Sequence, residues 1–432
     1  MNSRSATLTS TENTTSGAHA SLSRRLLVDA LTGMDRGSLI IELPEGGQLL
    51  FGDPAPQADL NMGISPHAAI RVRRESFFKK CVLAGDIGFG ESFVDGDWES
   101  SDLTAVIGWF INNVENAPTL SGSKRKRWKD RAVNLLRIAN RFGHLLRPNN
   151  RTTARRNISE HYDLSNEFFA LFLDQNMMYS GAHFAAVDTP LIEAQAAKNE
   201  ALCQKLQLQT GDHVLEIGTG WGGWAIHAVK NHDCKVTTVT ISKEQRDLAV
   251  QRIADAGLSD RIDVQLRDFR DITGSYDKIV SIEMMEALGH RYQTAFAEAI
   301  ARLLKPSGRV ALQFITCPDG RYEEFRKGVD FIQKHIFPGS LLLSTNRINQ
   351  LLAQSGNFVL RGLEDHGLDY TITLRHWQSA FSRRLDDVRA LGFDDRFIRK
   401  WEYYLHYCEA AFGLRNISVV QTVHTRANFL AG

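Results

Sequence analysis

The stretch VLEIGTGWGGWAIHA, residues 214–228, decides how the second half of this chain folds. An apolar run ends at an acid, Glu216, and four glycines then fall within six positions. Glycine costs conformational order in a folded chain, so this much backbone freedom after a buried strand indicates that a ligand lies against the main chain. Gly218, Gly220 and Gly223 satisfy the pattern G-x-G-x-x-G, which several nucleotide-binding folds share. The alternative is a tight strand-to-helix turn that binds no ligand.

The charges around these glycines distinguish two classes of ligand. A dinucleotide site needs an acid at the end of the second strand, where it holds the ribose hydroxyls, but here that strand ends in TIS at residues 240–242. Glu216 would repel a pyrophosphate, whereas it suits a cationic ligand with an amino group, such as S-adenosylmethionine (SAM). We therefore predict a SAM site rather than a nicotinamide site.

Strand and helix patterns alternate from about residue 200 onward. The expected strands are HVLEIG, KVTTVT, RIDVQL, YDKIVSI and RVALQFIT. Such alternation predicts an α/β fold in which a doubly wound parallel sheet carries helices on both faces. NFVLRGLED, two long helical stretches over residues 370–412 and a closing strand NISVVQTVHT follow. Because this is more helix than the sheet needs, we expect a helical lid insertion at about 320–413.

Length and composition indicate more than one domain. The chain has 432 residues, of which 43% are hydrophobic. Residues 1–25 have the composition of a disordered tail and lack the apolar segment of a secretory signal. Residues 26–120 predict a smaller α+β domain with a hairpin around PEGGQ, and residues 158–432 predict the catalytic domain. Five scattered cysteines without metal or redox spacing favour free thiols in a reducing cytoplasm.

The segment between these domains, residues 121–157, is strongly basic. Twelve Lys or Arg and a single acid lie between residues 124 and 156, and apolar residues recur there at helical spacing. A basic amphipathic helix suits an anionic lipid surface, and a solvated linker helix is the alternative. No run of 18 apolar residues predicts a membrane span, and the net charge of +1 gives no reason to expect nucleic acid.

Several stretches, in order along the chain, resemble the cyclopropane-fatty-acyl-phospholipid synthases and their mycolic-acid and plant relatives. They are EHYDLSNEFFALFLDQNMMYSGAHF, VLEIGTGWGGWA, VTISKEQ, IEMMEALGHRY, QFIT, DYTITLRHW and YYLHYCEAAF. GDIGFGESFVDGDWESSDL resembles the amino-terminal domain of the full-length synthases, so the resemblance covers roughly residues 65–425. It implies a class I SAM-dependent methyltransferase with a Rossmann-like sheet closed by an antiparallel strand. It also implies action on unsaturated acyl chains of membrane phospholipids, a cytoplasmic location at the inner face of the membrane, and a homodimer.

The resemblance assigns SAM contacts to matching positions of this chain. They are Tyr179, Ser180, Gly218, Gly220, Thr240, Gln245 and Asp268. Thr240 and Gln245 can hydrogen-bond ribose hydroxyls where other families use a carboxylate.

The expected chemistry begins with an alkene, which is a poor nucleophile. It must be held in line with the methyl–sulfur bond in a dry pocket. Methyl transfer leaves a carbocation, a base then removes a proton from the new methyl group, and the ring closes. In the family that the chain resembles, a bound bicarbonate is that base, held by a Cys, a Glu, a His, a backbone group beside an Ile, a Tyr and a second Cys.

The resemblance places four of these groups at Glu286, Tyr370, Ile315 and Cys408. At two positions the chain departs, because Gly181 replaces the first Cys and Gln313 replaces the His. Gln313 can still donate a hydrogen bond to an anion, whereas Gly181 offers only its backbone N–H. We therefore expect a weakened or reshaped bicarbonate site.

The altered site leaves the product open. If the base is displaced, the cation can lose a different proton and give a methyl- or methylene-branched acyl chain instead of a cyclopropane. Glu286 could instead be a helix-start carboxylate, a role that Glu283 could share, and Tyr370 and Cys408 could be core residues.

Two other functions remain as alternatives, a small-molecule N- or O-methyltransferase and a non-catalytic lipid-binding relative. The synthase-like amino-terminal domain and the basic segment argue against a soluble substrate. His161, His183 and His290 lack metal spacing, so no metal site is expected.

Overall fold

The computed structural model describes residues 21–55, 57–113 and 165–428, which divide between two units. Within these ranges, the first unit comprises residues 21–113, 329–334 and 389–416. The second comprises residues 165–328, 335–388 and 417–428. The basic segment of residues 121–157 lies outside the described residues.

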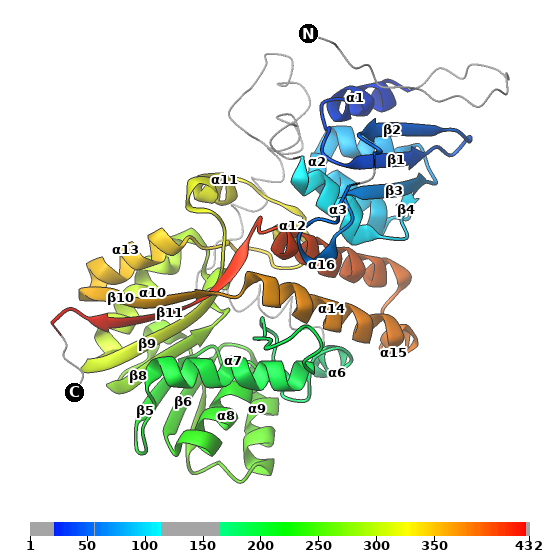
Figure 1. The fold of residues 1–432 in the computed structure, drawn as a ribbon. Coiled ribbons are helices and arrows are strands. Elements are labelled where there is room, and N and C mark those ends of the chain that lie inside the picture. The colour runs from blue at the N-terminus through cyan, green and yellow to red at the C-terminus, as the bar shows by residue number, and fades with distance from the viewer. Residues whose placement is uncertain (1–20, 56, 114–164, 429–432) are drawn as a thin grey trace. The chain divides into compact units, whose positions relative to one another are not determined.

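The second unit is built on a seven-stranded sheet of order β10-β11-β9-β8-β5-β6-β7 (Figure 1). The strands are β5 (His213–Ile217), β6 (Lys235–Thr240), β7 (Ile262–Leu266), β8 (Tyr276–Ile282), β9 (Leu304–Thr316), β10 (Phe358–Asp365) and β11 (Ser418–Arg426). Neighbours among β5 to β9 run parallel, whereas β11 is antiparallel to both β9 and β10. All the expected strands of this half are present, which confirms the doubly wound sheet with a closing antiparallel strand.

Helices cover both faces of this sheet. Successive residues of a strand point to opposite faces, so neighbouring residues of one strand pack against different helices. Val214 packs into one core with residues of α7 (Leu191–Leu206), α8 (Gly223–His232) and α9 (Lys243–Asp255). The next residue, Leu215, packs into the other core with residues of α10 (Gly289–Leu303) and α13 (Thr345–Gly356). Two-sided burial explains why these strands read as nearly continuous apolar runs. The unit's remaining helices include α6 (Asn166–Ala170), α11 (Tyr322–Lys327) and α14 (Gly367–Arg383).

The first unit contains a four-stranded sheet of order β2-β1-β3-β4. Its elements are α1 (Leu22–Leu31), β1 (Ser38–Glu42), β2 (Gln48–Gly52), β3 (His67–Val72), α2 (Ser76–Val94), β4 (Trp98–Glu99), α3 (Leu103–Asn112), most of α12 (Phe331–His335) and α16 (Asp395–Gly413). β1 and β2 form the antiparallel hairpin expected around PEGGQ, and β3 pairs with β1 in parallel. This is the expected smaller α+β domain. α15 (Leu385–Ala390) crosses from the second unit into this one.

Two domain boundaries differ from the sequence expectation. α1 begins at Leu22, inside the expected tail of residues 1–25, because the Ser21 hydroxyl caps the helix by accepting a 3.2 Å hydrogen bond from the Arg24 N–H. The expected lid is divided, because residues 329–334 and 389–416 pack with the first unit. The physical reason is that α16 buries an apolar face against α2 and α3.

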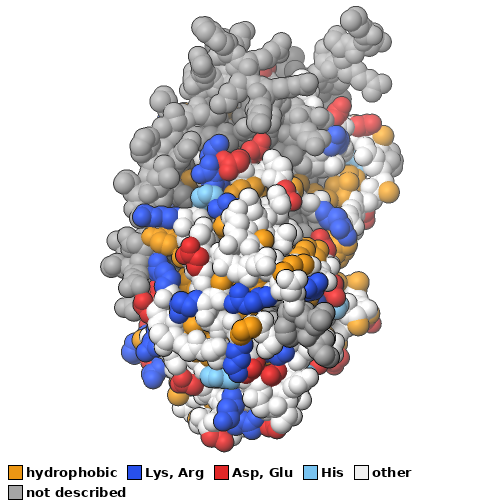
Figure 2. Space-filling model, turned by 90° about the vertical axis from the view of Figure 1, so that its left-hand side faces the viewer, with side chains coloured by type: hydrophobic (Ala, Val, Ile, Leu, Met, Phe, Trp, Pro, Cys, Tyr) orange, Lys and Arg blue, Asp and Glu red, His pale blue; other side chains and the backbone are white. Residues whose placement is uncertain are grey.

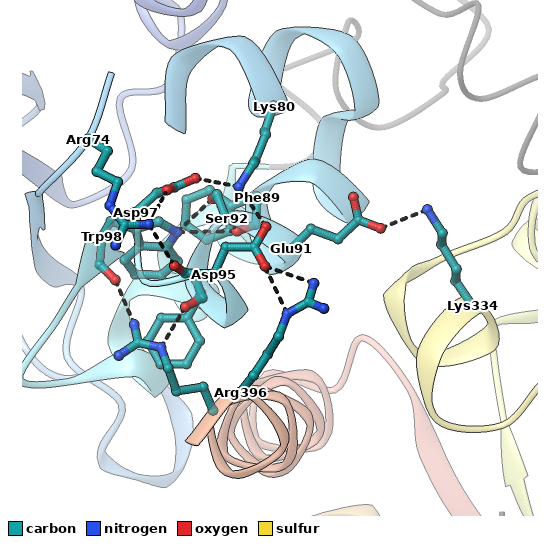
Figure 3. A network of polar contacts seen from close by, with 12 residues as sticks. Arg74, Lys80, Phe89, Glu91, Ser92, Asp95, Asp97, Trp98, Lys334 and Arg396 are labelled. Atoms are coloured by element: carbon teal, nitrogen blue, oxygen red, sulfur yellow. Dashed lines mark hydrogen bonds and ion pairs between the residues drawn. The ribbon is translucent and has the colours of Figure 1, made fainter. Parts of the chain in front are cut away.

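Ion pairs also fasten α16 and α12 within the first unit (Figure 3). Arg396 lies 2.8 Å from Asp95, and Lys80 lies 2.7 Å from the same carboxylate. Lys334 lies 2.7 Å from Glu91 on α2. Arg396 and Asp95 are 301 residues apart and Lys334 and Glu91 are 243 residues apart, so local sequence patterns could not reveal these two pairs.

Candidate active site

The glycine loop joins β5 to α8 in the second unit. Gly218 has φ +105°, and a Cβ built there would lie 3.0 Å from the Cβ of Met284. Gly220 has φ +52°, and a Cβ built there would meet no atom within 4 Å. Strain and Met284 therefore disfavour a side chain at Gly218, while the main chain at Gly220 borders open space. This geometry allows a ligand to lie against bare backbone.

Glu216 lies directly before this loop and already has a protein partner. Its Oε2 accepts a 2.6 Å hydrogen bond from the Thr238 hydroxyl on the neighbouring strand. Burial raises the pKa of Glu216 to about 8, while Thr238 and the Lys198 charge act in the opposite direction. The contact with a ligand amino group, which the charge pattern predicts, stays a prediction.

β6, which pairs with β5, and β7, which pairs with β6, are followed by or end in other residues expected to contact the ligand. Thr240 donates a 3.0 Å hydrogen bond to Gln245 Oε1, which orients the Gln245 amide. Asp268, after β7, pairs with Arg270 through Oδ1 at 2.8 Å and Oδ2 at 2.5 Å. Ligands of open α/β sheets bind beyond the carboxyl ends of the strands, and this is where the structure places these side chains.

Tyr179 and Ser180 lie in the segment before α7. The Tyr179 ring centroid is 5.2 Å from that of Phe169 and 5.3 Å from that of Trp377. The Ser180 hydroxyl accepts a 2.9 Å hydrogen bond from Lys198 Nζ. Packing and this hydrogen bond fix both residues, and their contacts with SAM stay predictions.

Lys198, on α7, is a buried cation that sequence reasoning missed. Only 1% of the residue is exposed, and burial lowers its pKa to about 8. The neighbouring charges of Glu283, Asp174 and Glu216 act to raise that pKa again. A lysine is almost never fully buried unless it is paired, so Lys198 serves as a counter-charge for these carboxyl groups. No sequence signal marks it, because a lysine on a helix normally faces water.

Glu283 follows β8 and forms the centre of a buried polar cluster. Its Oε1 accepts hydrogen bonds from the Gly181 N–H at 2.9 Å and from Gln313 Nε2 at 2.8 Å. Its Oε2 accepts a 2.8 Å hydrogen bond from the Tyr370 hydroxyl. Desolvation raises the pKa of Glu283, and these three donors oppose that rise because they stabilise the ionised form. The fold thus brings three expected site residues together around a carboxylate.

This arrangement does not fit a bicarbonate held by the same donors. Gly181, Gln313 and Tyr370 are paired with the Glu283 carboxylate, which presents two planar anionic oxygens of its own. Glu283 adopts φ +46°, and such strain in a non-glycine residue is concentrated at functional sites. Sequence reasoning considered Glu283 only as a helix-start carboxylate. The missed signal is the pair of glutamates three residues apart after a strand, combined with Gln313.

Glu286 lies in the 3₁₀ turn that follows (Met285–Leu288). Its Oε1 accepts a 2.5 Å hydrogen bond from the Ile315 N–H, and its buried Oε2 has no hydrogen-bond partner among the described residues. Burial, together with the Glu283 charge, raises the pKa of Glu286 to about 8. The two carboxyl groups therefore differ: three donors stabilise the ionised form of Glu283, whereas Glu286, with its pKa raised to about 8, keeps its proton at pH 7.

Cys408 is the only expected site residue that lies in the first unit, where it belongs to α16. Burial, and to a lesser degree the Asp330 charge, raises the pKa of its thiol. The resemblance alone assigns Cys408 to the site, so its catalytic role stays a prediction beside the packing alternative.

We expect Gly181→Ala to damage the Glu283 cluster. A Cβ at this position would lie 2.7 Å from Cδ2 of Tyr370, so the ring must move and its hydroxyl must leave Glu283. Overpacking of this kind costs about 1–3 kcal/mol, and we expect turnover to fall by about 10-fold or more with the loss of a positioned hydrogen bond. Urea unfolding and initial rates of methyl transfer measure the two effects.

Gly320→Ala is the matched control, because a Cβ at Gly320 meets no atom within 4 Å. It should change neither stability nor rate. Wild-type behaviour of Gly181→Ala would show that Tyr370 can move without consequence.

The sheet, the glycine loop and the polar groups at the strand ends define a SAM-dependent methyltransferase. SAM fits the residues present, because the space at Gly220 is open and hydroxyl and amide groups follow the next strand. Residues 149–422 match the family model described as mycolic acid cyclopropane synthetase. The chain belongs to this family.

Individual relatives support the same assignment. The tuberculostearic acid methyltransferase UfaA1 of Mycobacterium tuberculosis is 41% identical over 357 residues, which cover 81% of each chain. The cyclopropane-fatty-acyl-phospholipid synthase of Escherichia coli K12 is 36% identical over 371 residues, covering 86% of this chain and 91% of the relative. The structure of mycolic acid cyclopropane synthase CmaA1 complexed with SAH and CTAB aligns with a TM-score of 0.58 and 31% identity, covering 63% of this chain and 98% of that one.

Proposed function

We propose that this transferase adds one carbon across the cis double bond of an unsaturated phospholipid acyl chain and closes a cyclopropane ring. When bound, SAM supplies an electrophilic methyl group. The observation that carries the proposal is the buried Glu283 carboxylate. The next residue, Met284, lies beside the glycine loop, since a Cβ built at Gly218 would be 3.0 Å from the Cβ of Met284. The identity to the synthase of E. coli supports the acyl substrate.

Glu283 can accept the proton that must leave before the ring closes. A carboxylate offers roughly two acceptor sites on each oxygen. From the described part of the chain, Oε1 accepts two hydrogen bonds and Oε2 accepts one, which leaves Oε2 an acceptor site for the proton. Tyr370 holds Oε2 in place, and Gln313 is anchored in turn by a 2.9 Å hydrogen bond from Gln421. In its ionised form, which the three donors favour, the carboxylate would also stabilise positive charge on the acyl chain in this buried setting.

We therefore expect turnover to be independent of bicarbonate. Glu283 occupies the donors that a bicarbonate would need, so a buffer depleted of carbon dioxide should leave the rate unchanged within about 2-fold, well below the 10²–10⁴-fold that a missing general base costs. Initial rates with and without added bicarbonate test this expectation. A rate that falls on depletion and recovers on addition would assign the proton transfer to bicarbonate.

A methyl- or methylene-branched product is a second candidate, favoured by the 41% identity to the tuberculostearic acid methyltransferase. The two outcomes share the first carbon–carbon bond. Loss of a proton from the added methyl group to Glu283 closes the ring. A 1,2-hydride shift would move the cation to the methyl-bearing carbon, and loss of a methyl proton would then leave a methylene branch.

One experiment separates these products from the other functions. The purified protein is incubated with methyl-labelled SAM and vesicles of unsaturated phospholipid, and the acyl methyl esters are analysed by mass spectrometry and proton NMR. Gain of CH2 with upfield ring protons supports cyclopropanation, and gain of CH2 with vinylidene protons supports the branched product. Label in a water-soluble product would indicate a small-molecule methyltransferase, and no transfer would indicate a non-catalytic relative.

Folding stability should depend on pH through Glu286. In the folded chain its pKa is about 8, against an ordinary value of 4.5. Between these values the folded chain keeps a proton that the unfolded chain has released, so the stabilising contribution is complete below pH 4.5 and is lost as the pH rises toward 8. Glu286→Gln removes this dependence. The difference in melting temperature, variant minus wild type, should therefore increase between pH 5 and pH 8.

Glu298→Gln, at an exposed position of α10, is the control and should leave the pH dependence of melting as it is in wild type. If the melting temperatures of wild type and Glu286→Gln instead change in parallel between pH 5 and pH 8, Glu286 is already ionised in the folded protein over this range.

We also propose that the protein is cytoplasmic and binds an anionic membrane surface peripherally through the basic segment of residues 121–157. Within the described ranges, no helix is long and apolar enough to cross a bilayer. The described part of the face in Figure 2 mixes basic and acidic side chains, so the twelve basic residues of the segment are the stronger candidate for lipid contact. Vesicle sedimentation should show binding that needs anionic lipid and weakens with salt, and sedimentation velocity tests the homodimer.

A further inference from the structure

Three polar side chains of the second unit converge on one point, away from the reacting groups. Nε2 of His232 lies 3.0 Å from Oε2 of Glu200, and Nε2 of His227 lies 3.2 Å from the same oxygen. Glu200 belongs to α7, and both histidines belong to α8. The packing of α7 against α8 therefore aims two imidazoles at one carboxylate oxygen.

These separations match ligands that share a metal ion. Zinc binds histidine nitrogen and carboxylate oxygen at about 2.0–2.1 Å, which puts neighbouring ligand atoms roughly 2.9 Å apart at octahedral angles and 3.4 Å apart at tetrahedral angles. The observed 3.0 and 3.2 Å fall between these limits. Little movement of Glu200 or His232 is therefore needed for these two side chains to share the ion.

Cys203 supplies a fourth ligand. It lies one turn after Glu200 on α7 and is completely buried. Its Sγ and the ligand atoms of Glu200 and His232 all lie within 4.8 Å of one another. Zinc deprotonates a coordinating thiol and binds its sulfur at about 2.3 Å, so a small inward movement of Cys203 lets it share an ion with Glu200 and His232. His227 lies outside the group of ligand atoms within 4.8 Å of one another and has to move further to complete a tetrahedral set.

A neighbouring side chain holds Glu200 so that one of its carboxylate oxygens is left for the ion. Gln204 Nε2 donates a 3.2 Å hydrogen bond to Glu200 Oε1, which leaves Oε2 for the ion.

The cluster lies apart from the glycine loop. α8 begins at Gly223, and His232 is its last residue, about 14 Å further along a helix that rises 1.5 Å per residue. A metal ion here would connect α7 to α8 without touching the reacting chain.

We propose that Glu200, Cys203, His227 and His232 form a structural zinc site. Sequence reasoning predicted no metal, because the four ligands come from two helices and show no metal-binding spacing. A second set of ligating groups among the described residues, His183, His366 and Asp369, is less suited, because His366 is already shared between Asp369 and Glu364.

The test is direct binding of zinc to the full-length protein after treatment with a chelator. Calorimetry should show one Zn²⁺ per chain, and zinc should raise the melting temperature. His232→Gln should weaken binding by more than about 100-fold, since changes in outer-shell partners alone cost 10- to 100-fold. Co²⁺ as the probe should give a thiolate charge-transfer absorption that Cys203→Ala abolishes.

Two variants serve as controls. His366→Gln removes a histidine of the second set and should leave zinc affinity unchanged, and Cys234→Ala should keep the cobalt–thiolate absorption. Absence of zinc binding, or equal affinity in wild type and His232→Gln, would overturn the proposal. If His366→Gln loses zinc binding while His232→Gln keeps it, zinc binds at the second set and the proposal is wrong. None of these measurements uses methyl transfer, so they stand apart from the proposed function.

Discussion

Replacing Glu283 by glutamine should lower the turnover number by about 10²–10⁴-fold, the range of a lost general base. An amide cannot accept the proton that leaves the acyl chain, and its NH2 group would face donors that now bind a carboxylate. The affinity for SAM should change little, because the glycine loop is expected to hold SAM. The hydrogen bonds of Glu283 come from Gly181, Gln313 and Tyr370, none of which belongs to that loop. Initial rates and calorimetry with S-adenosylhomocysteine measure the two effects.

Glu286→Gln is the matched comparison, because it makes the same substitution three residues away. Glu286 is protonated at neutral pH, and glutamine resembles a neutral carboxylic acid, so its loss of rate should be at least about ten times smaller than that of Glu283→Gln. If the glutamine at 286 proves the more damaging, the proton acceptor is Glu286. A melting curve of each variant distinguishes lost chemistry from lost folding.

The second large effect is expected from Gly220→Val. A β-branched residue at φ +52° is strained by about 1–3 kcal/mol, and its side chain would fill the open space beside the loop. We expect the affinity for S-adenosylhomocysteine to fall by about 100-fold or more, the equivalent of roughly 2.7 kcal/mol, with a parallel loss of turnover. Calorimetry on the folded variant provides the measurement.

Gly257→Val provides the control for strain. Gly257 is exposed, has φ +70°, and a Cβ there also meets no atom within 4 Å. The two variants share the backbone penalty and differ only in their distance from the proposed ligand. Equal affinity in both would mean that the glycine loop does not hold SAM.

Much of the fold could be predicted from the sequence because its signals are local. The apolar runs that become β5 to β9 are short and separated by helical patterns, and alternation of this kind permits few topologies. The glycine loop is equally local, since the need for positive φ at Gly218 and Gly220 is a property of those residues. The division of the lid was missed because the partners of α16 lie about 300 residues earlier.

The sequence by itself determined that this chain forms a doubly wound sheet with a SAM-type glycine loop, because strand periodicity and glycine geometry act over a few residues. Only the tertiary structure decided which carboxylate serves the site. Glu283 and Glu286 are three residues apart and chemically identical, but Glu283 alone meets donors from Gly181, Gln313 and Tyr370. Those donors come together only when α14 and the segment before α7 lie beside the ends of β8 and β9, so the ionisation of each glutamate depends on long-range packing.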